Sequence, residues 1–365
     1  MSEVVRVELG ARGYDIHVGP GLLARAGALL GKFAPEGRVF VVTDENVARL
    51  HAPALEAGLA AAGLASVRIT LPAGEASKSW GQLGGLLERL LEHRPERRSL
   101  LLALGGGVIG DLAGLAASLL LRGVDYVQVP TTLLAQVDSA VGGKTAVDSV
   151  RGKNLIGAFH QPRLVLADLD ALGTLPPREL RAGYAEVVKY GLIDDPTFFA
   201  WCETHCAALL AGDRAALGTA VAASCRAKAR IVGADEREAD ARMLLNLGHT
   251  FAHAFETALG FDAALLHGEA VAAGMALAFD LSAALGLCPA EDARRVRRHL
   301  AGSGLPVDPP PGAGDPDRLI ELMRQDKKAR GGLTFILARG IGRAFVARDV
   351  APDAVRASLS RALAA

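Results

Sequence analysis

The first half of the chain alternates short apolar runs with longer stretches in which apolar residues recur every three or four positions. A continuous apolar run of four to eight residues is typical of a buried strand, and the longer stretches are typical of amphipathic helices. This alternation predicts a parallel sheet covered by helices, because parallel strands need crossover connections. The predicted strands of this sheet cover residues 38–43, 66–71, 99–104, 125–129 and 164–168, after a hairpin over 4–9 and 14–18.

The alternation stops after residue 168, and Pro176-Pro177 follows. From there the pattern is helical, which predicts a second domain. A length of 365 residues agrees with two domains, since one domain commonly has roughly 100–200 residues. We therefore predict an α/β domain over 1–175 and a mostly helical domain over 176–365. The helices predicted in the second domain cover 178–192, 196–211, 214–232, 246–259, 268–285 and 290–302, with another up to residue 328 before a short strand over 333–337.

Composition narrows the class of protein. Hydrophobic residues make up 50% of the chain, which favours a large core, and 40 basic residues balance 40 acidic ones. A neutral chain without a basic stripe argues against nucleic acid as a partner. No apolar stretch is long enough for a membrane span, and the first eight residues have no signal-peptide pattern. Four cysteines without a CxxC pair favour a reducing, cytoplasmic location.

A glycine-rich turn joins a predicted strand to a predicted helix. Gly105, Gly107 and Gly110 satisfy the pattern GxGxxG. Glycines at such a turn let backbone N–H groups approach a phosphate, and the helix N-terminus favours its negative charge. The acidic residue expected roughly twenty positions later is absent, and Asp111 instead follows the turn directly. The motif is compatible with nucleotide binding or with a tight packing turn.

A second glycine-rich stretch includes Gly143-Lys144-Thr145. It resembles the end of a P-loop, but Asp138 stands where the first glycine of that motif belongs, so an NTPase is excluded. Lys144 and Lys153 lie in this loop-like sequence. They could bind an anionic substrate or simply be solvated surface lysines.

The helical half carries candidate metal ligands. His249 and His253 are four residues apart and share one helix face. His267 begins another predicted helix, and Glu186 lies on a third. Two histidines and one carboxylate suit zinc or cobalt with an open position for substrate. The zincin motif HExxH is absent because Thr250 follows His249. The alternative is that each histidine is an ordinary core or surface residue.

Several strings, in order from about residue 44 to 342, resemble one family. They span nearly the whole chain, so their order is far more specific than any single motif. The chain resembles the 3-dehydroquinate synthases, sugar phosphate cyclases distantly related to metal-dependent polyol dehydrogenases. The strings are GGGVIGDLAG (105–114), PTTLLAQVDS (130–139), VGGKT (141–145), GKN (152–154), TLP (174–176), AEVVKYG (185–191), LNLGHT (245–250), HGEAV (267–271) and DKK (326–328).

The resemblance implies a divalent metal, Zn²⁺ or Co²⁺, bound by Glu186, His249 and His267. It leaves His253 free for proton transfer and substrate positioning. It also implies a Rossmann-like first domain that binds NAD⁺ and a helical second domain that binds metal and substrate. The implied NAD⁺ neighbours are Asp44, Asn46, Glu75, Lys78, Gly106, Gly107, Val108, Asp111, Thr131, Thr132, Lys144, Lys153 and Thr174.

The family's catalytic and substrate residues can be carried over in the same way. The implied catalytic residues are Lys144, Lys153, Asn154, Glu186, Lys189, Lys228 and His253. The implied substrate-binding residues are Arg122, Asp138, Arg242, Asn246, Lys327 and Lys328. The chain departs from the family pattern at Ser149-Val150, His160, Asp240 and Ala252, which puts local loop shape in doubt rather than chemistry.

The reaction implied by the resemblance converts 3-deoxy-D-arabino-heptulosonate 7-phosphate to 3-dehydroquinate and phosphate. The substrate is transiently oxidised by NAD⁺, loses phosphate, is reduced again and closes its ring by an intramolecular aldol step. This is a carbon–oxygen lyase reaction of the shikimate pathway of aromatic amino acid biosynthesis. The resemblance also suggests a homodimer.

Three alternatives stay open. A sister cyclase would make a valiolone or an aminated quinate from another sugar phosphate, although Arg242, Asn246 and the triplet 326–328 favour the dehydroquinate reaction. A metal-dependent glycerol-type dehydrogenase is disfavoured by the many lysines able to bind phosphate. A non-catalytic binding protein on the same scaffold is disfavoured by the intact ligand positions.

Overall fold

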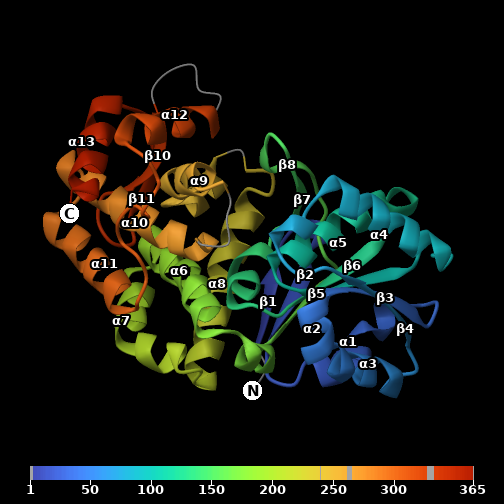
Figure 1. Cartoon of the computed structure of the whole chain (residues 1–365). Helices are drawn as coiled ribbons and strands as arrows, with labels where there is room; N and C mark the ends of the chain where they lie inside the picture. Colours follow the sequence, from blue (N-terminus) through green and yellow to red (C-terminus); the bar gives the residue numbers. More distant parts are fainter. Residues whose placement is uncertain (1–2, 239, 261–264, 327–332, 365) are drawn as a thin grey trace. The chain divides into compact units, whose positions relative to one another are not determined.

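The computed structural model describes residues 3–238, 240–260, 265–326 and 333–364 (Figure 1). The chain forms two compact units. Unit 1 comprises Met1–Pro176 and Arg214–Arg237, and unit 2 comprises Pro177–Asp213 and Glu238–Ala365. The predicted boundary near residue 175 lies beside the first of these divisions. The prediction of a single boundary is wrong for Arg214–Arg237, because this helical segment packs on the first two strands of unit 1.

Unit 1 is built on a seven-stranded sheet in the order β1-β2-β9-β6-β5-β3-β4. β1 and β2 form the predicted antiparallel hairpin, and every other neighbouring pair is parallel. All six residues of β5 are buried, as its continuous apolar sequence predicts. The strands are β1 (Glu3–Val7), β2 (Tyr14–Gly19), β3 (Arg38–Asp44), β4 (Ala65–Leu71), β5 (Leu100–Gly105), β6 (Asp125–Pro130) and β9 (Leu164–Asp168).

Helices cover both faces of this sheet. Side chains alternate between faces along a strand, and β3 shows the alternation: Phe40 packs in one core with Leu83 and Leu112, while Val41 packs in a second core with Leu55. The parallel α/β fold of unit 1 therefore agrees with the sequence pattern (Figure 1). The helices of unit 1 are α1 (Ala26–Leu30), α2 (Glu45–Leu50), α3 (Ala52–Ala61), α4 (Trp80–Glu92), α5 (Gly107–Leu119) and α8 (Arg214–Ala234).

A hairpin replaces the predicted loop around residue 150. β7 (Lys144–Ser149) pairs antiparallel with β8 (Gly152–Phe159). Most residues of β8 are exposed, and its apolar residues lie in a glycine-containing second half, LIGAF, after the polar start GKN. This glycine-rich sequence is typical of a loop, which is why the sequence pattern did not reveal the strand.

Unit 2 packs its helices around α10, whose side chains are buried almost all round. The helices α6, α9 and α11 surround it, together with a hairpin of β10 and β11. β11 and the last helix were not predicted from the sequence. The elements are α6 (Pro177–Asp194), α7 (Pro196–Leu210), α9 (His249–Ala258), α10 (His267–Ala284), α11 (Ala290–Gly302), α12 (Pro316–Asp326), α13 (Pro352–Leu363), β10 (Leu333–Ala338) and β11 (Ala344–Val350).

Within the described ranges, no helix is both long and apolar enough to cross a membrane.

Candidate cofactor and metal sites

The carboxyl edge of the unit 1 sheet gathers the residues predicted to contact NAD⁺. The chain order reverses between β3 and β5, which are hydrogen-bonded neighbours. In open α/β sheets, ligands bind outside the carboxyl ends of the strands at such a switch point. Asp44 ends β3, Gly105 ends β5, Thr131 follows β6, and Thr174 follows β9 at the end of a short helical turn. Parallel strands bring these positions to one edge.

The glycine turn has both a packing role and an open face. A Cβ on Gly105 would lie 2.6 Å from the Ile109 side chain, and one on Gly110 would lie 2.8 Å from Gln128 Oε1. Those two glycines are therefore required for packing. A Cβ on Gly107, the first residue of α5, would lie 3.2 Å from Ser139 Oγ. The first N–H groups of a helix lack intrahelical acceptors, so the turn can cradle a phosphate.

Lys78 is fixed beside the start of α5. Its ammonium forms an ion pair with Asp111 at 2.6 Å and donates to Asn154 Oδ1 at 2.5 Å. Asn154 is held in turn, since its N–H donates to Asp148 Oδ1 at 2.8 Å. Burial disfavours the ammonium, but the carboxylates of Asp111, Glu75 and Asp148 together outweigh that effect and raise the pKa of Lys78. This network places three predicted functional residues in contact.

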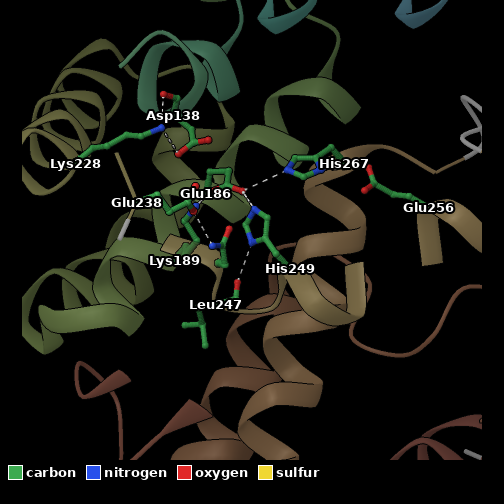
Figure 2. A network of polar contacts seen from close by, with 10 residues as sticks. Asp138, Glu186, Lys189, Lys228, Glu238, Leu247, His249, Glu256 and His267 are labelled. Atoms are coloured by element: carbon green, nitrogen blue, oxygen red, sulfur yellow. Dashed lines mark hydrogen bonds and ion pairs between the residues drawn. The ribbon is translucent and has the colours of Figure 1, made fainter. Parts of the chain in front are cut away.

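Lys228 and Asp138 form a second pair within unit 1. The Lys228 ammonium lies 2.8 Å from Asp138 Oδ1 and 2.6 Å from the Asp138 carbonyl oxygen (Figure 2). Lys228 is on α8, the helix that returns to unit 1, and it is only 5% exposed. Lys228 was predicted to belong to the helical domain, but its contact with Asp138 lies within the α/β unit.

The other predicted residues of unit 1 are more exposed. The side chain of Asp44 accepts hydrogen bonds from the N–H groups of Asn46 and Val47 and so caps α2. Lys153 lies 3.6 Å from Glu75 in an ion pair. Arg122 has a positive φ of 70° and lies between α5 and the start of β6, so it is at the amino edge of the sheet and not at the carboxyl edge. The remaining predicted residues are Lys144, which is exposed at the start of β7, Thr132 and Val108, which are half buried, and Thr174, whose hydroxyl lies 2.8 Å from His51 Nε2.

In unit 2, the predicted metal ligands come together. One ligand atom from each of Glu186, His249 and His267 lies within 4.8 Å of the others. The Nε2 atoms of His249 and His267 lie 3.6 Å and 3.7 Å from the same atom, Glu186 Oε1 (Figure 2). Glu186 lies in α6, while each histidine is the first residue of its helix, α9 or α10.

Glycines allow these three helices to approach closely. Gly248, just before His249, has a φ of +83°, and a Cβ there would lie 2.7 Å from the Met275 backbone nitrogen. A Cβ on Gly268, just after His267, would lie 1.9 Å from the Ala182 carbonyl oxygen. Side chains at these positions would push α9 and α10 away from their neighbours. The glycines therefore help to set the positions of both histidines.

The donor set fits a divalent metal. Glu186 is fully buried, and neither of its carboxylate oxygens has a hydrogen-bond partner among the described residues. The ammonium of Lys189 forms an ion pair with Oε2, so Oε1, which faces both histidines, is the oxygen that lacks a compensating cation among the described residues. A buried carboxylate oxygen without a hydrogen bond is costly unless a cation compensates it. Two imidazole nitrogens facing the same carboxylate suit Zn²⁺ or Co²⁺.

The remaining predicted residues of unit 2 have separate surroundings. The ring of His253 lies 5.6 Å from that of His249, centroid to centroid, and His253 is not part of the ligand group. Asn246 Nδ2 donates to Glu238 Oε1 at 3.0 Å. Arg242 is 1% exposed. Lys327 and Lys328 lie outside the described residues.

Residues that the sequence reasoning missed support the predicted ones. Asp148 orients Asn154, Glu238 holds Asn246, and Glu256 contacts His267. Glu269 accepts two hydrogen bonds of 2.7 Å from Arg178, and its side chain also caps α10 at the Leu266 N–H. Glu269 lies in the string HGEAV near the start of a predicted helix, and Glu256 also had a signal in the sequence. Glu256 is the residue that spacing relates to a metal ligand. It follows His249 by seven residues, so it belongs to the helix face that His249 and His253 define.

The departures from the family pattern are accommodated by local packing. His160 stacks on Tyr126 with ring centroids 5.2 Å apart, and its Nε2 lies 2.9 Å from the Val124 carbonyl oxygen. Ala252 is fully buried in α9. Ser149 and Val150 lie at the turn of the β7–β8 hairpin, and Asp240 precedes a short helical turn.

Comparison with known proteins places these features in a family. The family model described as 3-dehydroquinate synthase N-terminal matches residues 68–182, and the one described as 3-dehydroquinate synthase C-terminal matches residues 183–329. The chain is 60% identical to the 3-dehydroquinate synthase of Rhodospirillum rubrum, over 100% of this chain and 96% of that protein. It is 56% identical to the 3-dehydroquinate synthase of a Jannaschia species, over 100% of both chains.

Solved structures are similar over nearly the whole chain. A 2-epi-5-epi-valiolone synthase from Streptomyces hygroscopicus, with NAD⁺ and Zn²⁺ bound, is 32% identical with a TM-score of 0.88, covering 96% of this chain and 97% of that one. A 2-deoxy-scyllo-inosose synthase with NAD⁺ and Co²⁺ is 26% identical with a TM-score of 0.86, covering 99% and 100%. A glycerol dehydrogenase from Schizosaccharomyces pombe is 17% identical with a TM-score of 0.69, covering 95% and 88%, and shows the shared fold alone.

Proposed function

The chain belongs to the 3-dehydroquinate synthase family, and from this premise we propose that it converts 3-deoxy-D-arabino-heptulosonate 7-phosphate to 3-dehydroquinate and phosphate. The observation that carries the proposal is full-length likeness to synthases of this name, combined with a ligand group that fits a metal. Structural relatives with NAD⁺ and Zn²⁺ or Co²⁺ support the same cofactors here.

In this proposal unit 1 binds NAD⁺ at the carboxyl edge of its sheet. The backbone N–H groups at Gly107 and Val108 would hold the pyrophosphate, as the start of a helix does in dinucleotide-binding folds. The cofactor supplies a hydride acceptor that is regenerated within each turnover. Lys78 would keep Asp111 and Asn154 in place along this edge, because it is bonded to both.

In unit 2, Glu186, His249 and His267 would hold the metal. The metal supplies a Lewis acid that polarises a substrate hydroxyl and the ketone derived from it. Lys189 lies in an ion pair with Glu186, so its ammonium would help to bind a substrate oxygen near that carboxylate. His253, which is outside the ligand group, would accept or donate a proton during phosphate elimination or ring closure.

The charges of the substrate explain the remaining basic residues. Phosphate and carboxylate groups are bound most strongly by charge-assisted hydrogen bonds. We assign this role to Lys144, Lys153 and Arg242, with Asn154, Asn246, Lys327 and Lys328 as further contacts. The family resemblance also implies Arg122, but in this chain it lies at the amino edge of the unit 1 sheet, so we do not assign it this role. Asp138 would orient Lys228, since the two are already paired.

The direct test supplies the heptulosonate phosphate with NAD⁺ and Zn²⁺ or Co²⁺, and follows free phosphate and the carbocyclic product. We expect stoichiometric phosphate and 3-dehydroquinate without net NADH. Omitting NAD⁺ should stop phosphate release. Stoichiometric NADH accumulation would instead identify an ordinary dehydrogenase and reject the proposal.

A sister cyclase is the second candidate, because the valiolone synthase is 32% identical over nearly the same length. The two functions differ in whether the substrate carries a carboxylate. Turnover of a sugar phosphate that lacks the carboxylate, at a rate above that of the heptulosonate phosphate, would favour the sister reaction. We expect the opposite preference.

We also propose that the protein acts as a cytoplasmic homodimer. All four cysteines are free thiols, which fits a reducing compartment. The dimer rests on the family resemblance. One chain has a mass of 37.9 kDa. Light scattering at micromolar concentration should give twice that mass.

A further inference from the structure

The two histidines of the metal-binding group are held in different ways. The Nε2 atom of each ring points toward Glu186 Oε1. The other ring nitrogen, Nδ1, can therefore form a hydrogen bond to a residue that is not a metal ligand. Nδ1 of His249 lies 3.2 Å from the carbonyl oxygen of Leu247. Nδ1 of His267 lies 3.2 Å from Glu256 Oε1 (Figure 2). One histidine therefore faces a neutral acceptor and the other a carboxylate.

We infer that Glu256 is a positioning residue that orients His267 and strengthens it as a metal ligand. The inference rests on the proposed metal site and assigns a function to a residue outside it. An acceptor at Nδ1 keeps the proton there and leaves the Nε2 lone pair for a metal, and a carboxylate acceptor also increases the basicity of the ring.

The surroundings of His267 show why it needs this contact more than His249. The side chain of His267 is 34% exposed, while that of His249 is 11% exposed. Packing therefore restrains the His267 ring less. Glu256 is 5% exposed, so water competes little for the contact with Nδ1. The buried carboxylate of Glu256 can therefore hold the orientation of the His267 ring, which the packing around that ring restrains only weakly.

The position of Glu256 also ties two helices together. It lies on α9 seven residues after His249, about two turns on a helix of 3.6 residues per turn. The same face of α9 therefore supplies one ligand directly and orients the other, which begins α10. Any shift of α9 along α10 would disturb both histidines at once. The backbone end of His267 is fixed separately, by Gly268 against Ala182 and by the Glu269 cap.

The test compares Glu256→Gln and Glu256→Ala with the wild-type full chain. The readouts are the Zn²⁺ and Co²⁺ dissociation constants, measured by competition with a chromogenic chelator, and the visible spectrum of the Co²⁺-loaded protein. Outer partners of metal-bound histidines typically contribute about 10–100-fold in metal affinity. We expect Glu256→Ala to weaken binding by about that factor and to alter the Co²⁺ spectrum.

Glu256→Gln separates orientation from charge. Its amide oxygen can still accept from Nδ1–H, so we expect a smaller loss and a spectrum closer to wild type. It also keeps the test decisive if Glu256→Ala fails to fold. Asp280→Asn is the matched control, because Asp280 is a carboxylate on α10 that pairs with Arg297 and not with His267. We expect this variant to bind metal as the wild type does.

The outcomes separate the inference from the proposed function. If the wild type binds metal and turns over substrate while both Glu256 variants keep its dissociation constants and spectrum, the inference is overturned and the function stands. Equal losses in Asp280→Asn would also overturn it, because the effect would then be general destabilisation. A wild type that binds no metal would overturn both.

Discussion

The candidate sites of the two units differ in how completely their buried charges are paired. In unit 1 the charged residues near the glycine turn are already paired, Lys78 with Asp111 and Lys228 with Asp138. In unit 2 the ammonium of Lys189 pairs with Glu186 Oε2, but Oε1, which faces both histidines, has no hydrogen-bond partner among the described residues. Unit 1 is thus prepared electrostatically without its cofactor, whereas unit 2 retains an acceptor that a cation would satisfy. The two sites should respond differently to substitution and to metal removal.

The strongest test of this difference is Glu186→Gln. The amide keeps the size of the side chain but removes the charge that both histidines face. We expect metal binding and turnover to fall by more than about 100-fold, beyond the effect of an outer partner, with NAD⁺ affinity unchanged. Metal content after gel filtration and steady-state turnover give the measurement. Glu179→Gln, an exposed carboxylate on the same helix, is the control, and retained metal in Glu186→Gln would reject the ligand assignment.

Lys78→Met should expose the cost of breaking a pair in unit 1. It leaves Asp111 without its ion-pair partner, and removing one member of a buried pair costs about 3–5 kcal/mol. We expect a loss of about 3 kcal/mol in the free energy of unfolding, together with weaker NAD⁺ binding, measured by urea denaturation and titration.

The control for that prediction is Lys153→Met. Lys153 pairs with Glu75 at 3.6 Å, and both side chains are more exposed than those of the Lys78 pair. Exposed pairs contribute about 0–1 kcal/mol, so this variant should lose little stability. Equal losses in the two variants would contradict the distinction between the buried and the exposed pair.

Removing metal with a chelator should destabilise unit 2. A ligand present at about 100 times its dissociation constant stabilises the folded state by about 2.7 kcal/mol. We expect a lower melting temperature and no turnover after chelation, both restored by Zn²⁺ or Co²⁺. NAD⁺ titration of the chelated protein should give the same dissociation constant. Loss of NAD⁺ binding on chelation would show that the two sites are not independent.

A smaller effect is expected from Gly107→Ala in the glycine turn. The new Cβ would lie 3.2 Å from Ser139 Oγ, so the turn must shift slightly. We expect NAD⁺ affinity to fall several-fold, with metal affinity unchanged. Gly81→Ala is the control, since a Cβ there meets nothing within 4 Å in the helix α4. It should stabilise the protein by about 0.5–1 kcal/mol.

The smallest effect concerns pH, and each unit contains one suitable histidine. Burial lowers the pKa of His51 in unit 1, near Asp168, Asp44 and Thr174, and burial also lowers the pKa of His299 in unit 2, near Tyr184, Glu203 and Arg295. The unfolded chain then binds more protons, so stability should fall as the pH drops below about 6.5. Melting temperatures between pH 5 and 8 should show shallower slopes for His51→Gln and His299→Gln. Slopes equal to that of the wild type would contradict this.

The sequence pattern predicted the frame of both units for a physical reason. Buried parallel strands such as β5 need continuous apolar sequence, and amphipathic helices such as α4 show their periodicity by burying Leu83, Leu86 and Leu90 on one face. The β7–β8 hairpin was not predicted because β8 is largely exposed and its glycines and polar start made the segment resemble a loop. The return of Arg214–Arg237 to unit 1 escaped because helical periodicity does not say on which unit a helix packs.

The candidate sites were predictable to a different extent. The residues alone paired His249 with His253 and offered His267 and Glu186 as further candidates, and only the family resemblance removed His253 from the ligand set. The geometry agrees with that selection, since His267 faces the same Glu186 oxygen as His249. Supporting contacts such as Asp148 with Asn154 depend on side-chain rotamers and on strand pairing, which no local pattern encodes.

The return of α8 to unit 1 has a consequence for how the protein is made. The α/β unit is discontinuous in the chain, because residues 177–213 are synthesised before Arg214–Arg237 completes it. When only the first 176 residues have emerged from the ribosome, all strands of the sheet are present but α8, which packs on β1 and β2, is not. Asp138 also still lacks Lys228, its ion-pair partner from α8. The unit therefore cannot be completed during translation until part of the helical unit has also emerged.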